Sequence, residues 1–328
     1  MTQNKHNAAI LGGGSFGTAM ASILAANGHS VNLWVRDPET AAAINIDREN
    51  SRYLPGAELP EGVTATDNLE EALTHASMVF VAIPSKAFAE VLEQARQWVP
   101  DNTLVISCTK GIYAEGFLLM SELLHQYWPH TRIGVLSGPN LAKEVVEQKF
   151  TGTVIASPDE QLRQTVQDAL SCDYFRVYDK PDIYGVELGG ALKNIYAVAS
   201  GMAAAIGVGE NSRSFLITRA LAEMSRFAVE LGANPMTFLG LSGVGDLIAT
   251  CTSSLSRNYQ VGFQLGEGKS LEEAFAHLGQ TAEGINTIKL VADKAAELDV
   301  YMPSVSYTHL RAHETLRYLV CRLLREKK

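Results

Sequence analysis

Lys193 stands alone as a cation in the stretch LGGALKNIYAVASG, which otherwise holds small and apolar residues. On a helix such a lysine either extends to the surface along its aliphatic stem or stays buried as a functional group, and spacing alone favours neither. Burial or a second ammonium nearby would lower its pKa from about 10.4 to about 7–8. A lysine in that range exchanges protons near neutral pH, as the reduction of a carbonyl to an alcohol requires.

A glycine-rich turn, Gly12–Gly17, fits the pattern GxGxxG between a short apolar run and a helical stretch. Gly12 can make a tight turn, Gly14 lets a pyrophosphate approach the backbone, and Gly17 lets the helix pack close to the strand. The helix N-terminus adds free N–H groups and the positive end of its dipole. Glycines also cluster in structural turns, but this position favours dinucleotide binding.

The end of the second strand indicates which dinucleotide is bound, because an acidic residue there usually binds the ribose of NAD. Here the strand ends in Arg36-Asp37-Pro38. Asp37 before a proline is typical of a helix N-cap, and Arg36 could bind a 2′-phosphate and stack on adenine. We therefore expect NADP(H) as cofactor, with NAD(H) as a second candidate. The alternative for Arg36 is a solvated charge.

Strands and helices alternate in the first half of the chain. Helical stretches at 87–98, 117–127 and 161–170 lie among apolar runs at 8–11, 31–35, 78–83, 103–107, 133–136 and 154–156. Continuous apolar strands between helices predict a parallel sheet covered on both faces. From residue 184 the apolar spacing becomes helical. We predict an α/β, Rossmann-type dinucleotide-binding domain over 1–183, followed by an all-helical substrate domain over 184–303.

Composition limits the partners and the compartment. The chain has 328 residues, 46% of them hydrophobic, and a net charge of −9, which argues against nucleic-acid binding. A local basic cluster could still bind an anionic substrate. The N-terminus lacks the pattern of a signal peptide, and the longest small-apolar stretch, 197–208, is too short to insert into a membrane. Four scattered cysteines without a CxxC pair favour a cytoplasmic location over a disulfide or zinc framework.

Seven motifs occur in one order along the chain: ILGGGSFGTA, SCTKGI, SGPNLAKEV, LGGALKNIYAVASG, GVGDLIATC, SRNYQVG and AEGINT. Together, from Ala8 to Pro303, they resemble the bacterial NAD(P)-dependent glycerol-3-phosphate dehydrogenase family. The resemblance implies a Rossmann domain joined to an all-helical domain, with the active site between them. It also implies reversible hydride transfer between sn-glycerol 3-phosphate and dihydroxyacetone phosphate, in the supply of phospholipid synthesis. Dimers are common among such enzymes, so a homodimer is possible here.

The resemblance also implies roles for single residues, with Lys193 as the proton acceptor. The implied cofactor contacts, beyond the glycines of the turn, are Ser15, Phe16, Arg36, Lys110, Ala142, Arg257 and Glu283. The implied substrate contacts are Lys110, Gly138, Asn140, Lys193, Asp246, Ser256, Arg257 and Asn258. Family members often have Ser or Thr where Asn140 stands, and an amide can still hydrogen-bond a substrate oxygen.

The same residues make chemical sense together. Lys110 would add positive charge where an alkoxide develops and would help to lower the pKa of Lys193. Asp246 could hold the ammonium, or could cap a helix after Gly245. Ser256-Arg257-Asn258 before a helical stretch would form an anion site, or simply a polar helix start. The alternative for Glu283 is a solvated loop acid.

The last segment, residues 304–328, departs from the family. It reads SVSYTHLRAHETLRYLVCRLLREKK and holds six Lys or Arg and two Glu, in an otherwise acidic chain. We interpret it as read-through or cloning-derived sequence and exclude it from functional reasoning. Its apolar spacing from residue 316 on could still form an amphipathic helix. His309 and His313 have the spacing of metal ligands on a helix, but without a third ligand we expect no metal there.

Two other functions stay open. One is a related two-domain dehydrogenase for another hydroxy acid, of the 6-phosphogluconate or ketopantoate type. The other is a nucleotide-binding sensor that has lost catalysis. The joint presence of Lys110, Lys193, Asp246 and Arg257 argues against the sensor.

Overall fold

The computed structural model describes residues 5–278 and 283–311 and divides into two compact units. Unit 1 runs to Thr109 and resumes over Leu118–Ile183. Unit 2 comprises Lys110–Phe117 and the chain from Tyr184 onward. The short segment Lys110–Phe117 thus belongs to the helical unit although it is surrounded in sequence by the sheet unit.

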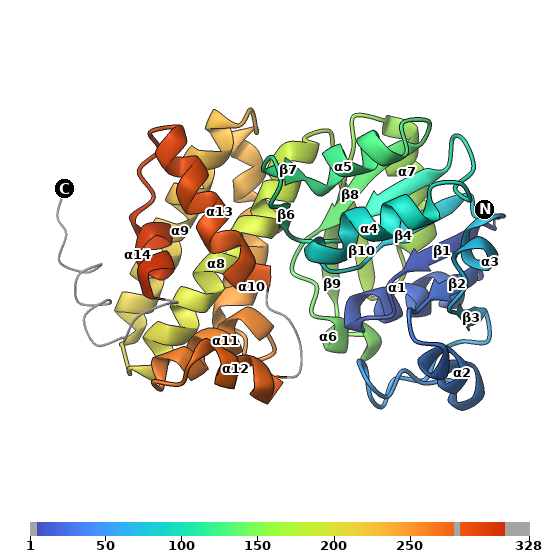
Figure 1. The fold of residues 1–328 in the computed structure, drawn as a ribbon, viewed down its shortest axis with the longest axis horizontal. Helices are drawn as coiled ribbons and strands as arrows, with labels where there is room; N and C mark the ends of the chain where they lie inside the picture. Colours follow the sequence, from blue (N-terminus) through green and yellow to red (C-terminus); the bar gives the residue numbers. More distant parts are fainter. Residues whose placement is uncertain (1–4, 279–282, 312–328) are drawn as a thin grey trace. The chain divides into compact units, whose positions relative to one another are not determined.

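Unit 1 is built on one sheet with the strand order β10-β9-β8-β5-β4-β1-β2-β3 (Figure 1). Around β1 the order 3-2-1-4-5, continued by β8, is that of a Rossmann fold, as predicted. The pairs from β3 through β8 are parallel. The strands are β1 (Asn7–Leu11), β2 (Ser30–Trp34), β3 (Val63–Thr66), β4 (Met78–Val81), β5 (Leu104–Ser107), β8 (Arg132–Ser137), β9 (Thr151–Ala156) and β10 (Phe175–Lys180).

The sheet is not parallel throughout. β9 pairs antiparallel with β8, and β10 then pairs parallel with β9. A parallel connection needs a crossover over the sheet, whereas the chain between β8 and β9 carries only the five-residue helix α6 (Ala142–Val146). The prediction of a parallel sheet therefore holds for its centre, and the last two strands run in the opposite direction.

Three helices of unit 1 begin at a residue whose side chain caps them. Asp37, Asn68 and Asp159 each accept backbone N–H groups at a helix start. After α1, Gly28 takes φ +89°, the left-handed conformation that ends a helix. The remaining elements of the unit are α1 (Ser15–Ala26), α2 (Pro38–Asp47), α3 (Leu69–Leu73), α4 (Ser85–Ala95), β7 (Leu118–Leu119), α5 (Met120–Tyr127) and α7 (Glu160–Leu170).

Over its described residues, unit 2 is helical apart from the two-residue strand β6 (Ile112–Tyr113). Its central helix, α8 (Ile183–Ala205), is buried at every position from Gly185 to Ala203. The other elements are α9 (Glu210–Glu230), the 3-10 helix η1 (Pro235–Leu239), the π-helical turn η2 (Leu241–Gly245), α10 (Asp246–Thr252), α11 (Arg257–Gly266), α12 (Leu271–Leu278), α13 (Glu283–Glu297) and α14 (Pro303–Arg311).

Glycines let helices of unit 2 touch backbone to backbone. A Cβ on Gly201 of α8 would lie 2.0 Å from the carbonyl oxygen of Tyr259, and one on Gly262 of α11 would lie 2.0 Å from that of Val198. Any side chain at either position would separate the two helices. This tight crossing fixes α11 against the central helix.

The start of the atypical tail is part of the core of unit 2. Ser304, Val305 and Thr308 of α14 are buried. His313, and the side chain of His309, lie outside the described residues, as does the apolar spacing from residue 316 on. Within the described ranges, no three His, Cys, Asp or Glu side chains gather as a metal site would require, and none of the helices has the length and apolarity to cross a membrane.

Candidate active site

The glycine turn has the geometry of a phosphate cradle. Gly12 takes φ +117°, and a Cβ there would lie 2.5 Å from the carbonyl oxygen of Ala82. A Cβ on Gly17 would lie 2.0 Å from the carbonyl oxygen of Gly12, so α1 packs directly on the turn. At Gly14, by contrast, a Cβ would meet nothing within 4 Å. This open space lies at the N-terminus of α1, where first-turn N–H groups lack intrahelical acceptors, and it fits a pyrophosphate.

Neighbouring residues hold this turn in place, and sequence reasoning missed one of them, Asn50. A Cβ on Gly13 would lie 2.1 Å from Cγ1 of Val35, so this third glycine is also required. The buried Asn50 donates from Nδ2 to the carbonyl oxygen of Gly13 at 2.8 Å. Ser15 donates its hydroxyl to a backbone carbonyl, and Phe16 packs against the hydrophobic core. No spacing rule in the sequence pointed to Asn50.

The end of β2 presents one cation and one capping carboxylate. Arg36 is exposed. Asp37 caps α2, with Oδ1 accepting the N–H of Glu39 at 3.3 Å and Oδ2 accepting the hydroxyl of Thr40 at 2.5 Å. The hydrogen bond from Thr40 lowers the pKa of Asp37. The N-cap interpretation of Asp37 is confirmed.

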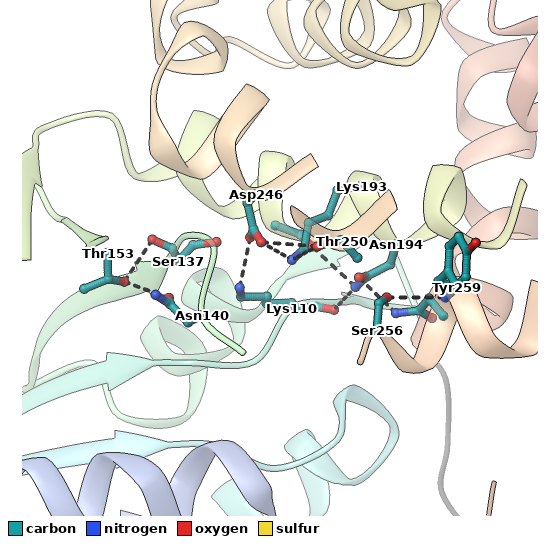
Figure 2. Close-up of polar contacts among 12 residues, drawn as sticks. Lys110, Ser137, Asn140, Thr153, Lys193, Asn194, Asp246, Thr250, Ser256 and Tyr259 are labelled. Atoms are coloured by element: carbon teal, nitrogen blue, oxygen red, sulfur yellow. Dashed lines mark hydrogen bonds and ion pairs between the residues drawn. The ribbon is translucent and has the colours of Figure 1, made fainter. Parts of the chain in front are cut away.

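The loop after β8 carries Gly138 and Asn140, and Figure 2 shows Asn140 beside Thr153. Gly138 has φ +153°, and a Cβ there would lie 3.1 Å from Cα of Thr153. Asn140 donates to the carbonyl oxygen of Gly152 at 3.1 Å and accepts the Thr153 hydroxyl at 2.9 Å. Its amide therefore holds the loop against β9. Ala142 begins α6 and packs against the core of unit 1.

Three charged side chains of unit 2 meet at one buried point (Figure 2). Lys193, only 5% exposed, donates to Oδ1 of Asp246 and, at 2.8 Å, to the hydroxyl of Thr250. Lys110 donates to Oδ2 of Asp246 at 2.9 Å. Asp246 lies in the first turn of α10 but bonds the two ammoniums instead of capping the helix. Of the two interpretations of Asp246, the structure thus supports ammonium binding.

Small residues on α8 allow this meeting. Gly189 precedes Lys193 by four residues and therefore lies on the same helix face. A Cβ on Gly189 would lie 2.5 Å from the carbonyl oxygen of Ser242 in η2. Because η2 runs directly into α10, its close approach to α8 brings Asp246 within reach of Lys193.

Burial sets the acid strength of the cluster. It lowers the pKa of Lys193 from 10.5 to about 7, and the charge of Lys110 lowers it as well, while Asp246 opposes the change. The ammonium and the amine are therefore both populated near neutral pH. Of the two alternatives for Lys193, a surface side chain or a buried one, the structure supports the buried one.

An amide network connects this cluster to α11 and α13. Asn194 donates to the carbonyl oxygen of Lys110 at 3.3 Å and accepts from Nδ2 of Asn258 at 3.0 Å. Oδ1 of Asn258 in turn accepts the N–H of Gly284 at 2.9 Å. A Cβ on Gly284 would lie 2.5 Å from the carbonyl oxygen of Asn194. The amide of Asn258 thus fixes the start of α13 beside α8.

The segment Ser256–Asn258 starts α11. Ser256 is its N-cap and accepts the N–H of Tyr259 at 3.3 Å, as the polar-helix-start interpretation predicts. Arg257 follows in the first turn; partial burial lowers the pKa of its guanidinium, and the charge of Glu283 at the start of α13 opposes that change. A guanidinium beside a helix N-terminus is a suitable arrangement for binding a phosphate.

Sequence reasoning missed Thr250 and Asn194 as members of the network. Thr250 lies four residues after Asp246, so helical spacing could have placed both on one face. Asn194 follows Lys193 directly, and its orientation toward Lys110 is a tertiary feature without a local signal.

Comparison with known proteins agrees with this geometry. The family model described as the NAD-dependent glycerol-3-phosphate dehydrogenase N-terminus matches residues 7–163, and the corresponding C-terminus model matches residues 182–316. Both units of the chain are thus covered by the two halves of one family description.

Individual relatives agree with the family models. The chain is 93% identical to glycerol-3-phosphate dehydrogenase (NAD(P)+) of Alcanivorax borkumensis over 303 residues, 92% of this chain and 88% of that protein. It is 56% identical to the protein of the same name from Pseudomonas aeruginosa, over 97% of this chain and 94% of that protein. The crystal structure of glycerol-3-phosphate dehydrogenase from Coxiella burnetii matches with a TM-score of 0.94 at 36% identity, covering 98% of this chain and 99% of that chain. The chain belongs to the NAD-dependent glycerol-3-phosphate dehydrogenase family.

Proposed function

We propose that this protein is an NAD(P)-dependent glycerol-3-phosphate dehydrogenase, which interconverts dihydroxyacetone phosphate and sn-glycerol 3-phosphate and so supplies glycerol 3-phosphate to phospholipid synthesis. The observation that carries the proposal is the buried Lys193, bonded to Asp246 beside a second ammonium, with a pKa of about 7. A nucleotide-binding sensor has no use for such a costly buried cluster.

Unit 1 would hold the dinucleotide. The cradle around Gly12, Gly14 and Gly17 has open space at the N-terminus of α1 for the pyrophosphate. Arg36 would bind the 2′-phosphate of NADP(H), and its position makes NADP(H) the preferred cofactor, with NAD(H) second. The bound nicotinamide supplies or accepts the hydride. The other proposed cofactor contacts, implied by the family, are Ser15, Phe16, Lys110, Ala142, Arg257 and Glu283.

Lys193 would handle the proton. When hydride adds to the carbonyl carbon of dihydroxyacetone phosphate, the carbonyl oxygen becomes an alkoxide and takes a proton from the Lys193 ammonium. In the oxidative direction the Lys193 amine takes the hydroxyl proton as the hydride leaves. Lys110 stabilises the developing negative charge, and Asp246 keeps both ammoniums in place. Lys193 is the residue we assign to catalysis.

The phosphate of the substrate would bind at the start of α11, where Arg257 and the first-turn N–H groups are located. Ser256 and Asn258 complete this anchor. Gly138 and Asn140 of unit 1 are the remaining proposed substrate contacts. Asn140 also bonds Gly152 and Thr153, so it would shape the loop as well as contact the substrate.

The pH dependence of both reaction directions tests the assignment of Lys193. Reduction needs the ammonium, so kcat/KM for dihydroxyacetone phosphate should fall as pH rises through about 7. Oxidation needs the amine, so kcat/KM for glycerol 3-phosphate should rise through the same pH. NADPH absorbance at 340 nm measures both rates. Titration of the substrate phosphate, with a pKa of about 6, would instead raise or lower kcat/KM in both reaction directions together. Opposite pH dependences of the two directions therefore point to Lys193.

Substrate choice tests the reaction class. Turnover of a carboxylate hydroxy acid, with no turnover of dihydroxyacetone phosphate, would replace the proposal with a related two-domain dehydrogenase. Binding of NADPH without turnover of either substrate would favour a sensor.

We further propose that the protein acts in the cytoplasm as a homodimer, with residues 1–183 as the dinucleotide-binding domain and 184–303 as the substrate domain. Light scattering coupled to gel filtration measures the mass directly. A value near the 35.5 kDa of one chain at micromolar concentration would reject the dimer.

A further inference from the structure

The segment Asn50–Leu54, between α2 and β3, is anchored directly on the glycine turn. Asn50 donates to the carbonyl oxygen of Gly13 and to the hydroxyl of Thr18, both at 2.8 Å. From the turn, Ser15 donates its hydroxyl to the carbonyl oxygen of Tyr53 at 2.7 Å. The phosphate cradle and this segment therefore form one hydrogen-bonded piece of unit 1.

The same segment is closed on itself. The carbonyl oxygen of Asn50 accepts the N–H groups of Tyr53 and Leu54 at 3.2 and 2.8 Å. The guanidinium of Arg48 donates to carbonyl oxygens on the far side of the loop, at Leu59 and Val63 among others. The backbone around residue 52 is thus fixed relative to the cradle.

Arg52 projects from this fixed backbone. Its side chain is exposed, and its guanidinium carbon lies 5.2 Å from the centre of the Tyr53 ring, which supports it by a cation–π contact. The segment lies beside the end of β2, because a Cβ on Gly13 would meet both Val35, which follows β2, and the amide of Asn50. The hydrogen bond from Thr40 is the main cause that lowers the pKa of Asp37, and the charge of Arg52 adds to it.

The carboxylate at the end of β2, Asp37, already accepts hydrogen bonds from within the protein. Asp37 lies 20 residues after Gly17, where an NAD enzyme commonly uses a carboxylate to bind the ribose hydroxyls. Here both oxygens of Asp37 already accept hydrogen bonds from α2. Its remaining negative charge would repel a phosphate, and the nearby guanidinium of Arg52 offsets that charge.

We propose that Arg52 is a second specificity-determining guanidinium, which binds the 2′-phosphate of NADP(H) together with Arg36. The inference rests on the proposed dinucleotide-binding function of unit 1. A 2′-phosphate carries about −1.5 to −2 charges at neutral pH, and guanidiniums bind it by charge-assisted hydrogen bonds. NAD(H) lacks this group, so Arg52 discriminates between the two cofactors.

The test is equilibrium binding to the full-length protein by titration calorimetry, independent of turnover. The ligands are NADPH and NADH, and the fragments 2′,5′-ADP and 5′-AMP, which differ in the 2′-phosphate alone. Arg52→Ala should weaken binding of NADPH and 2′,5′-ADP about tenfold, as the loss of a charged hydrogen bond does, and should change binding of NADH and 5′-AMP less than twofold. Arg52→Lys should retain part of the preference, because it keeps the charge without the planar fork.

Arg96→Ala is the matched control, because Arg96 is also exposed on unit 1 and its removal changes the net charge equally. It should leave all four affinities unchanged. Equal weakening of all four ligands by Arg52→Ala, or no change in any of them, would overturn the inference. If the wild type bound neither NADPH nor NADH, the proposed dinucleotide binding would itself fail. Tight NADPH binding by both wild type and Arg52→Ala would reject the role of Arg52 alone.

Discussion

Lys193 and Glu223 are two buried ionisable groups of unit 2 with opposite chemistry. At one, Lys193 and Lys110 share the carboxylate of Asp246. At the other, Glu223, fully buried in α9, accepts the N–H and hydroxyl of Ser304 at 3.1 and 2.9 Å and the hydroxyl of Tyr196 at 3.3 Å. Burial moves both pKa values toward neutrality, downward for Lys193 and upward for Glu223.

The partners distinguish the two sites. The hydrogen-bond donors around Glu223 are neutral groups of α8 and α14, and this carboxyl joins three helices. Arg219 and Arg226 act on Glu223 through their charge and form no ion pair with it, whereas Lys193 is ion-paired with Asp246. At Lys193 the partners are charged, and the ammonium of Lys110 keeps part of its surface accessible, with its side chain 18% exposed. Burial alone therefore does not identify a catalytic group. A buried ionisable side chain with an ion-pair partner and a pKa near neutrality is a much stronger candidate.

The largest effect is expected from Lys193→Met, which keeps the length of the side chain and removes the proton. We expect kcat to fall about 10²–10⁴-fold, the usual contribution of a general acid–base group. Steady-state assays in both directions measure the change. Lys289→Met, at an exposed position of α13, is the control and should retain full activity. Equal rates in wild type and Lys193→Met would remove Lys193 from the mechanism.

Asp246→Asn should have the next largest effect. The Asp246 charge raises the pKa of Lys193, so its removal lowers that pKa and moves the pH profile of reduction to lower pH. Less of Lys193 is then in the ammonium form at neutral pH, and reduction there slows. The variant also leaves two ammoniums without their buried partner, at a cost of about 3–5 kcal/mol of stability. Urea unfolding measures that loss separately. A profile displaced to higher pH would contradict the role given to Asp246.

Glu223→Gln should affect stability and leave catalysis unchanged. Because burial raises the pKa of Glu223 in the folded state, folding favours its protonated form. The wild type therefore loses stability as pH rises from about 4.5, the ordinary value, through the folded-state pKa. The glutamine variant should show a flatter dependence, measured by urea unfolding between pH 4.5 and 8. Glu230→Gln, exposed on the same helix, should behave like the wild type; an unchanged slope in Glu223→Gln would refute this account.

The central strands of the fold could be predicted because they are buried on both faces and read as continuous apolar runs. β3 and β10 were not predicted, and both lie at the edges of the sheet. In β10, Phe175 and Val177 are buried while the residues between and after them are exposed, so the apolar run is broken. The reversed direction of β9 depends on the short connection through α6, which strand patterns do not report.

The candidate site was predictable in its residue types and less so in its contacts. A lone lysine among small residues indicated Lys193, and family resemblance added Lys110 and Asp246. That Asp246 bonds both lysines follows from the approach of η2 to Gly189, a tertiary contact. Asn50 has no periodic or motif signal, because its role depends on a loop folding back onto the glycine turn.

The assignment of Lys110–Phe117 to the helical unit has a consequence for how acid strength is controlled. Phe117 packs edge-on against Phe227 at 6.0 Å, and Lys294 lies 5.9 Å over its ring, so this segment is fastened to helices α9 and α13. Lys110 therefore belongs to the same compact unit as Lys193, and Asp246 bonds both ammoniums. The acid strength of Lys193 is therefore an internal property of the helical unit, because the charges that raise and lower its pKa, Asp246 and Lys110, both belong to that unit.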